Sequence, residues 1–191
     1  MAYHGSNAKT AQSLLGGSEF LSSENSYDWL GSGVYFWEND PMRALQWARK
    51  RWEGIETPSV IGAAVDLGLC LDLTMQEGIE AVRSAHRELV AMHKISREPL
   101  PENAGSERGH RMLDCAVINH LHRARKRVAP NSPFQTVRAL FVEGAAVYDG
   151  AGFHDRTHIQ LCVIDQLQIQ GVFRLPKWQQ TLLGIDQDIY S

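Results

Sequence analysis

Residues 157–165 have the sequence Thr-His-Ile-Gln-Leu-Cys-Val-Ile-Asp, and this run decides the fold class. A period of two along it places His158, Gln160 and Cys162 on one face of a β-strand and aliphatic side chains on the other face, which we expect to be the core. Two more β-prone runs, residues 138–143 and 169–175, lie on either side of it. The C-terminal third of the chain is therefore predicted to consist of strands.

The first third of the chain combines helices with strands. Asn7 is a typical N-cap for a short helix that Gly16-Gly17 would end. Asp40-Pro41 supplies an N-cap and a proline at the first helical position, which predicts a second helix that ends near residue 51. Residues 33–37 and 60–66 are strand candidates because they are rich in β-branched and aromatic side chains or continuously apolar.

The middle of the chain has a helical pattern. Residues 74–77, Thr-Met-Gln-Glu, match a capping box, which predicts that a helix starts there. Prolines and a glycine make residues 96–106 a loop, and a second helix is expected over residues 107–127. We interpret residues 74–130 as a two-helix insertion in a single domain that spans residues 1–191. The order of mixed, helical and strand-rich segments predicts an α+β fold.

The composition is that of a soluble globular protein. Hydrophobic residues make up 43% of the 191 residues, and 19 basic against 22 acidic residues leave a formal net charge of −3. These values exclude a disordered polyelectrolyte and a globally basic nucleic-acid-binding protein. No apolar stretch approaches the roughly 20 residues that cross a bilayer, and the N-terminus lacks the pattern of a signal peptide. The cysteines are odd in number and far apart, so we expect no disulfide framework and a cytoplasmic location.

Three segments carry residues suited to binding or catalysis, and each also has a purely structural interpretation. Residues 4–6, His-Gly-Ser, would let a ligand approach the backbone closely, or they form an ordinary turn. Residues 31–37 lead from glycines into aromatic side chains that, with Trp47, either pack in the core or form a slot for a flat ring. His158 and Gln160 are either solvated or part of a polar site.

Taken in order, these segments resemble the ADP-ribosyltransferase superfamily, in the histidine–tyrosine–glutamate branch that contains diphtheria toxin and the poly(ADP-ribose) polymerases. Residues 3–6 are similar to its His-Gly-Ser/Thr strand, residues 31–37 to its Gly-x-Gly-Ile-Tyr-Phe-Ala strand, and residues 60–68 to its aliphatic strand. Residues 160–169 align without gaps with its last motif, from the glutamate onward. The resemblance implies a split β-sandwich of two small sheets with flanking helices, here with the helical insertion.

The resemblance implies that NAD is the substrate. His4 would hold a ribose of NAD, and backbone groups of Gly5 would hold the carboxamide. Tyr35 would stack on the nicotinamide, with Trp47 as its aromatic partner. The implied NAD-binding set is His4, Gly5, Ser6, Gly33, Tyr35 and Trp47.

The chain departs from the family pattern at Gln160, which stands where the family carries its catalytic glutamate. Glutamine keeps an acceptor oxygen but lacks the negative charge that stabilises an oxocarbenium-like transition state. Gln160, helped by His158, would orient the ribose, and Glu143 and Asp155 are candidates to restore the acid. The expected catalytic set is His4, Tyr35, Gln160, His158 and Glu143.

The resemblance implies a mono-ADP-ribosyltransferase that transfers ADP-ribose from NAD to RNA, DNA or protein and releases nicotinamide. Small intracellular transferases of this kind are often bacterial toxins or phage-defence effectors, which makes an antitoxin protein a candidate partner. Two alternatives stay open. The lost charge at Gln160 suits a non-catalytic module that binds NAD or ADP-ribose, and an RNA 2′-phosphotransferase shares the fold but needs basic residues around its phosphate.

The histidines and the basic residues raise two further hypotheses. His120 and His122 are two residues apart on a predicted helix and point about 200° apart, so they cannot hold one metal ion together, and no metal site is expected. Residues 107–127 contain six basic and two acidic residues, a local charge of +4. We interpret this segment as a solvated helix end, with a phosphate-contacting patch for nucleic acid as the alternative. That patch would consist of Arg123, Arg125, Lys126 and Arg127.

Overall fold

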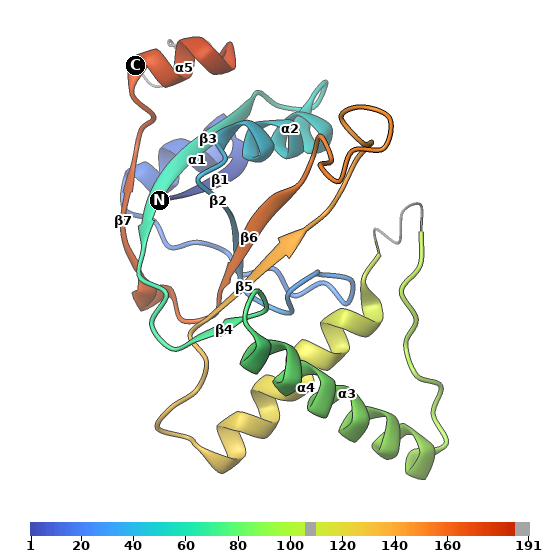
Figure 1. Ribbon diagram of the computed structural model, residues 1–191. Helices are drawn as coiled ribbons and strands as arrows, with labels where there is room; N and C mark the ends of the chain where they lie inside the picture. The colour runs from blue at the N-terminus through green and yellow to red at the C-terminus, as the bar shows by residue number, and fades with distance from the viewer. Residues whose placement is uncertain (106–109, 186–191) are drawn as a thin grey trace.

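The computed structural model describes residues 1–105 and 110–185, and it has the expected α+β fold (Figure 1). Seven strands form one curled sheet with the order β4-β5-β6-β2-β1-β3-β7. β4 and β5 run parallel, and every other pair of neighbours is antiparallel. The strands are β1 (Ala2–Asn7), β2 (Val34–Glu38), β3 (Pro58–Val65), β4 (Cys70–Asp72), β5 (Thr136–Phe141), β6 (His158–Val163) and β7 (Ile169–Phe173).

The sheet is split between β1 and β2. These strands share two register pairs, Ala2 with Glu38 and Tyr3 with Trp37, whereas β1 pairs with β3 over six residues. The register between β1 and β2 stops after Tyr3, so the sheet has two halves, β4-β5-β6-β2 and β1-β3-β7, that are joined at one end. The two small sheets that we expect from the resemblance are thus the halves of one continuous hydrogen-bonded sheet.

α1 (Ala8–Leu15) and α2 (Pro41–Trp52) begin where their capping residues predict. The Asn7 side chain accepts a hydrogen bond from the backbone N–H of Thr10, and the Asp40 carboxylate accepts one from the backbone N–H of Arg43. Each bond satisfies a donor that the first turn of a helix leaves unpaired. Both predicted helix starts are confirmed, and the second of them places Arg43 in the first turn of α2.

α3 (Gln76–Ser96) and α4 (Met112–Val128) lie between β4 and β5 in the chain and pack against each other (Figure 1). The capping box predicted at residues 74–77 is wrong. Thr74 donates its hydroxyl to Asp72 Oδ1 at 2.7 Å, and α3 starts two residues later without a side-chain cap. α4 begins at Met112 rather than near residue 107, and residues 106–109 lie outside the described part of the chain.

Three observed elements have no counterpart among the predicted ones. They are β4, the short 3-10 helix η2 (Gln166–Gln168) and the helix α5 (Lys177–Leu183). β4 is three residues long and is defined by its pairing with β5, so a local sequence pattern does not reveal it. None of the helices within the described residues is long and apolar enough to cross a membrane.

The strand β6 alternates as predicted. Cys162 packs with Leu30 and Ile118 on one side of the sheet, whereas Leu161 and Val163 belong to a different apolar cluster on the other side. Both sides are therefore covered. The three cysteines of the chain are free thiols, and burial raises the pKa of Cys162, which keeps this thiol protonated and unreactive at neutral pH.

We call the side of the sheet that carries Cys162 the Trp37 face. Trp37 of β2 and Gln160 of β6 are register partners, so their side chains lie next to each other on this face. α2 covers one end of it, where the Trp47 ring contacts the Trp37 ring. His158 lies two residues before Gln160 on the same face and is 4% exposed, which excludes a solvated position for this histidine.

Candidate functional site

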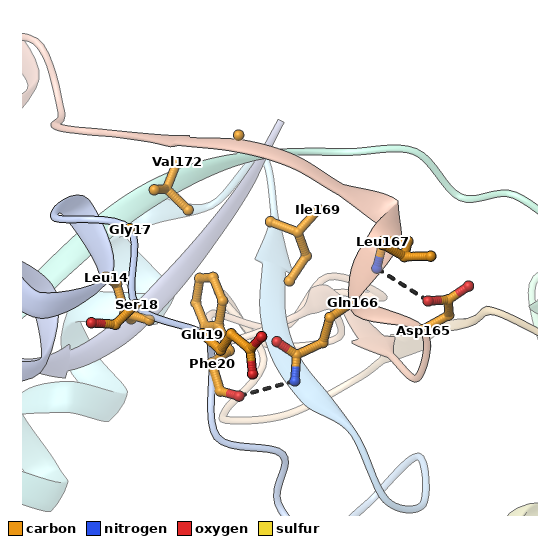
Figure 2. Close-up of a pocket in the computed structure, with 11 residues that line it drawn as sticks. Leu14, Gly17, Ser18, Glu19, Phe20, Asp165, Gln166, Leu167, Ile169 and Val172 are labelled. Carbon is orange, nitrogen blue, oxygen red and sulfur yellow. Dashed lines mark hydrogen bonds between the residues drawn. The ribbon is translucent and has the colours of Figure 1, made fainter.

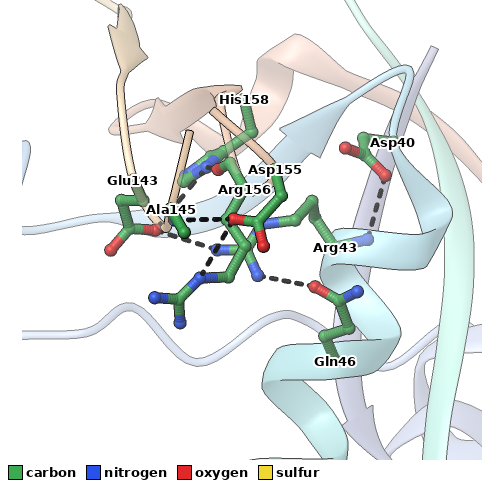
Figure 3. Close-up of polar contacts among 8 residues, drawn as sticks. All are labelled: Asp40, Arg43, Gln46, Glu143, Ala145, Asp155, Arg156 and His158. Carbon is green, nitrogen blue, oxygen red and sulfur yellow. Dashed lines mark hydrogen bonds and ion pairs between the residues drawn. The ribbon is translucent and has the colours of Figure 1, made fainter. Parts of the chain in front are cut away.

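A group of charged side chains joins α2 to the segment that follows β5 (Figure 3). Arg43 Nη2 donates to Glu143 Oε2 at 2.9 Å, and the same carboxylate oxygen lies 3.7 Å from His158 Nδ1. The Arg43 and Glu143 side chains are 14% and 21% exposed, and the His158 side chain is 0% exposed. Three elements that are distant in sequence therefore bring a cation, an anion and an imidazole together in a largely buried position.

The His158 ring is held in one tautomer. Nδ1 lies 2.8 Å from the carbonyl oxygen of Arg156, and because a carbonyl oxygen only accepts hydrogen bonds, Nδ1 carries the proton. Burial lowers the pKa of His158, while the bond to the Arg156 backbone opposes this effect and the charge of Arg43 adds to it. At neutral pH the ring is therefore neutral and has a lone pair on Nε2.

Four buried polar atoms on the Trp37 face and in the first turn of α2 have no hydrogen-bond partner among the described residues. They are Trp37 Nε1, Arg43 Nε, His158 Nε2 and Gln160 Oε1, and we call them the polar strip. His158 and Gln160 are about 7 Å apart along β6, and Trp37 is the register partner of Gln160. The strip offers two N–H donors and two acceptors. Buried polar groups are nearly always paired, so these four unpaired atoms make this part of the molecule a candidate ligand site.

Aromatic side chains border the polar strip. The Trp37 and Trp47 ring centroids are 5.7 Å apart, and Trp47 is 43% exposed while Trp37 is 4% exposed. All four atoms of the strip are shielded from solvent, so a ligand reaches them only when the side chains beside them move. Trp47 packs on Trp37 and is partly exposed, so it is the side chain whose movement would uncover the strip.

Gly5 brings β1 into contact with α2. A Cβ atom on Gly5 would overlap the carbonyl oxygen of Ala44 and would lie 3.3 Å from the Trp47 ring. Glycine is the residue that permits this close approach of strand and helix. The backbone of Gly5 therefore lies beneath Trp47, at the border of the candidate site.

Tyr35 lies on the Trp37 face, but its phenol is engaged with the backbone. The hydroxyl donates to the Gly31 carbonyl oxygen at 2.6 Å and accepts from the Leu30 N–H at 2.8 Å. Burial raises the pKa of Tyr35 far above its ordinary value, so the phenol is always protonated. Ser32 of the same loop donates its N–H to Asn119 of α4 at 3.1 Å. Tyr35 thus anchors the glycine loop, including Gly33, between β2 and the inserted helices.

His4 lies on the opposite side of the sheet. Its ring is 5.3 Å from the Phe20 ring and 5.5 Å from the Phe36 ring, and its Nδ1 donates to the Tyr35 carbonyl oxygen at 2.8 Å across the split between β1 and β2. Burial lowers the pKa of His4, and the bond to the Tyr35 backbone opposes this. Ser6, on the same side, is 4% exposed and donates to the Asn7 carbonyl oxygen.

The structure brings together one part of the expected site and separates the other. Glu143, His158, Gln160 and Trp47 gather around the polar strip, with Gly5 beneath Trp47. His4 and Ser6 side chains lie behind the sheet, because β1 continues the alternation that places Tyr3 and Gly5 on the Trp37 face. The Tyr35 ring is two residues from Trp37 along β2, and its hydroxyl is engaged with the glycine loop rather than turned toward the strip.

Two members of the site, Trp37 and Arg43, are not among the predicted site residues. Trp37 stands where the resembled strand pattern carries alanine, and this departure is a signal that could have pointed to it. Arg43 has no local signal, because its role depends on Glu143, one hundred residues away in sequence. Asp155, the other candidate acid, accepts from the Ala145 N–H at 3.1 Å and stabilises the loop between β5 and β6 (Figure 3).

The basic patch of α4 lies at the other end of β5. Arg125 donates to the Ser132 carbonyl oxygen at 2.7 Å and lies 4.3 Å above the Phe134 ring, just before β5 begins, whereas Glu143 follows the end of that strand. Six residues of strand span about 20 Å. Arg125 is thus engaged in the fold, and the exposed charges that remain in the patch are Arg123, Lys126 and Arg127.

Neither a metal centre nor the nearby groove adds to the site. Within residues 1–105 and 110–185 no three His, Cys, Asp or Glu side chains are placed to hold a metal ion. A groove of about 460 Å³ lies between α1 and β7 and contains none of the predicted site residues (Figure 2). One wall of this groove is closed by Gln166, whose side chain donates to the Phe20 carbonyl oxygen at 2.9 Å.

Comparison with known proteins gives one distant relative. The chain is 27% identical, over 181 residues, to an uncharacterized protein of the archaeon Methanocaldococcus jannaschii, and the match covers 84% of this chain and 80% of the relative. No protein-family model matches the chain, and no solved structure matches it. The similarity extends over most of both chains.

Proposed function

We propose that the protein is an NAD-dependent mono-ADP-ribosyltransferase of the cytoplasm, which transfers ADP-ribose to a macromolecular acceptor and releases nicotinamide. The observation that carries this proposal is the polar strip, two buried donors and two buried acceptors beside an exposed tryptophan. A nicotinamide riboside has the complementary groups, because its carboxamide and its hydroxyls both donate and accept and its ring is flat. The ordered motifs in the sequence lead to the same substrate.

Different residues of the site would contact the ring and the polar groups of the nicotinamide riboside. Trp47 has an exposed ring face that suits stacking on the nicotinamide. Trp37 Nε1 and Arg43 Nε donate to oxygen atoms of the substrate, and Gln160 Oε1 accepts from a ribose hydroxyl. Tyr35 acts indirectly in this proposal, because its hydroxyl fixes the loop from which β2 starts.

Glu143 supplies the negative charge that Gln160 lacks. Its carboxylate lies 3.7 Å from His158 and so beside the polar strip, where an anion stabilises the positive charge that develops on the ribose as the glycosidic bond breaks. Arg43 holds the carboxylate in place and also offsets part of its charge. We therefore expect turnover slower, by up to about 10²–10⁴-fold, than with a carboxylate directly on the ribose.

A non-catalytic module that binds NAD or ADP-ribose is the second candidate, because the residue in line with the family's glutamate carries no charge. An RNA 2′-phosphotransferase is a weaker candidate. Its phosphate needs a free cation, and Arg43, which lies beside His158, is paired with Glu143. An antitoxin partner and a role as a toxin or phage-defence effector remain hypotheses that rest on the sequence resemblance.

The test is nicotinamide release. Purified protein is incubated with NAD labelled in its adenylate part and with cell lysate, free nicotinamide is measured by chromatography, and the labelled product is treated separately with nuclease and protease. Glu143→Gln should reduce release strongly, and Glu56→Gln, an exposed site after α2, should not. Binding of NAD without release under every condition would favour the module, and neither binding nor release would refute the proposal.

A further inference from the structure

The unpaired ring nitrogen of His158 has a direction and a protonation state that the fold imposes. Nδ1 donates to the Arg156 carbonyl oxygen at 2.8 Å, which fixes both the ring orientation and the site of the proton. Nε2 is buried and has no partner among the described residues. The ring also packs against Phe141, with centroids 5.8 Å apart and planes 31° from parallel, so it cannot rotate freely.

The charges around His158 balance one another. Glu143 lies 3.7 Å from Nδ1 and would favour an imidazolium, and Asp40, the cap of α2, acts in the same direction. Arg43 lies on the other side of Glu143 and opposes both. Burial is the largest of these influences and favours the neutral ring. A neutral imidazole with a buried lone pair, next to a carboxylate that can stabilise it once protonated, has the properties of a general base.

We infer that His158 Nε2 is the base that removes the proton from the attacking group of the acceptor. This inference rests on the proposed function. The nucleophile X–H attacks the anomeric carbon of the nicotinamide ribose, and a new X–C bond forms as the bond to nicotinamide breaks. The electron pair of the broken bond goes to the nicotinamide nitrogen, and the proton of X–H goes to Nε2, which leaves an imidazolium stabilised by Glu143. Solvent removes this proton before the next turnover.

The same geometry limits the chemical class of the acceptor. A carboxylate acceptor needs no base, and it would meet the negative charge of Glu143. A guanidinium acceptor would meet the positive charge of Arg43, which lies within 2.9 Å of that carboxylate. A neutral group that must lose a proton is repelled by neither Glu143 nor Arg43, and it needs the base. The acceptor is therefore a hydroxyl or a neutral N–H group, of a nucleic acid or of a protein.

The first experiment does not depend on activity. In wild-type protein at neutral pH, ¹⁵N NMR of the imidazole rings, with the signal assigned through His158→Asn, should show His158 as the neutral Nδ1–H tautomer. A proton on Nε2, or a doubly protonated ring, would overturn the inference whatever the protein does with NAD. His93→Asn, the same substitution on α3, serves as the control for the assignment and for stability.

The second experiment measures transfer. His158→Asn keeps an N–H near the position of Nδ1 and removes Nε2, so the transfer rate at saturating NAD should fall by about 10²–10⁴-fold. Burial lowers the pKa of His158, so the wild-type rate should fall only at a pH below the ordinary histidine pKa of about 6.5, and this decline should disappear in the variant. If the variant fails to fold, as shown by circular dichroism, His158→Gln replaces it with the same expectations.

The outcomes separate the two claims. Wild-type protein that releases no nicotinamide with any acceptor contradicts the proposed function, and the tautomer is then judged by NMR alone. Wild-type protein that turns over, with a variant that keeps the full rate and the same pH profile, overturns the role of His158 and leaves the proposed function intact. Transfer to carboxylate groups alone would also overturn the inference about the acceptor.

Discussion

Replacing Tyr35 by phenylalanine removes one oxygen atom and keeps the ring. That oxygen accepts from the Leu30 N–H at 2.8 Å and donates to the Gly31 carbonyl oxygen at 2.6 Å, and Leu30 is 1% exposed. Its loss leaves a backbone donor and a backbone acceptor without this partner in a buried place. The unpaired Leu30 N–H costs about 1–3 kcal/mol, and the Gly31 carbonyl oxygen, which keeps a weak bond from the Cys162 thiol at 3.8 Å, costs about 1 kcal/mol, so we expect the variant to lose about 2–4 kcal/mol of unfolding free energy.

The measurement is urea unfolding followed by tryptophan fluorescence and circular dichroism, with thermal unfolding as a second probe. For a chain of this size the loss corresponds to a decrease of about 4–16 °C in melting temperature. Tyr148→Phe is the matched control, because Tyr148 is 62% exposed, and we expect it to change stability by less than about 0.5 kcal/mol. The folded Tyr35→Phe variant should still use NAD, because Trp47 rather than the Tyr35 phenol borders the polar strip.

A Tyr35→Phe variant as stable as the Tyr148→Phe control would refute the anchoring role of the phenol. An alkaline titration adds an independent check. The folded-state pKa of Tyr35 is raised, so its contribution to stability is complete below about pH 10 and is lost as the pH rises further. Wild-type protein should therefore lose more stability than the Tyr35→Phe variant above that pH.

Three further predictions concern single substitutions. Gln160→Glu should release nicotinamide at least as fast as wild type, because it restores a carboxylate, and a collapse of release with the fold intact would show that the amide is required. Burial, helped by Arg123, lowers the pKa of His122 to about 4, so its contribution to stability is present above about pH 6.5 and is lost as the pH falls toward 4. Urea unfolding should show that the unfolding free energy of wild type falls by about 3 kcal/mol more than that of His122→Leu over this pH range. Parallel plots of unfolding free energy against pH for the two proteins would contradict this. Gly5→Ala should destabilise the protein by about 1–3 kcal/mol in thermal unfolding, because its Cβ meets the α2 backbone, whereas Gly152→Ala, with open space around it, should have no such effect.

Features that depend on neighbouring residues could be predicted from the sequence. Asn7 and Asp40 cap their helices because the cap and its donor lie within one turn, and the alternation along β6 follows from strand geometry. The capping box at Thr74 failed for a reason outside that turn. Arg138 of β5 holds the Asp72 carboxylate at 3.2 Å, and this carboxylate accepts the Thr74 hydroxyl that would have capped α3.

The candidate site could be predicted only in part. His158 and Gln160 share a strand face, so their proximity follows from local periodicity. Arg43 and Glu143 meet because α2 packs over the end of the sheet, and no spacing in the sequence encodes that contact. His4 was placed in the site by its motif alone, and the alternation along β1 decides which side of the sheet it occupies.

Because β4 and β5 run parallel, the inserted helices α3 and α4 are needed to connect them. Two parallel neighbours cannot be joined by a hairpin, since the chain must first travel back to the end from which it started. α3 and α4 make that return journey. They form the crossover connection between β4 and β5, so they are part of the sheet's topology. A shortened protein that replaced them by a tight turn would lose β4 from the edge of the sheet.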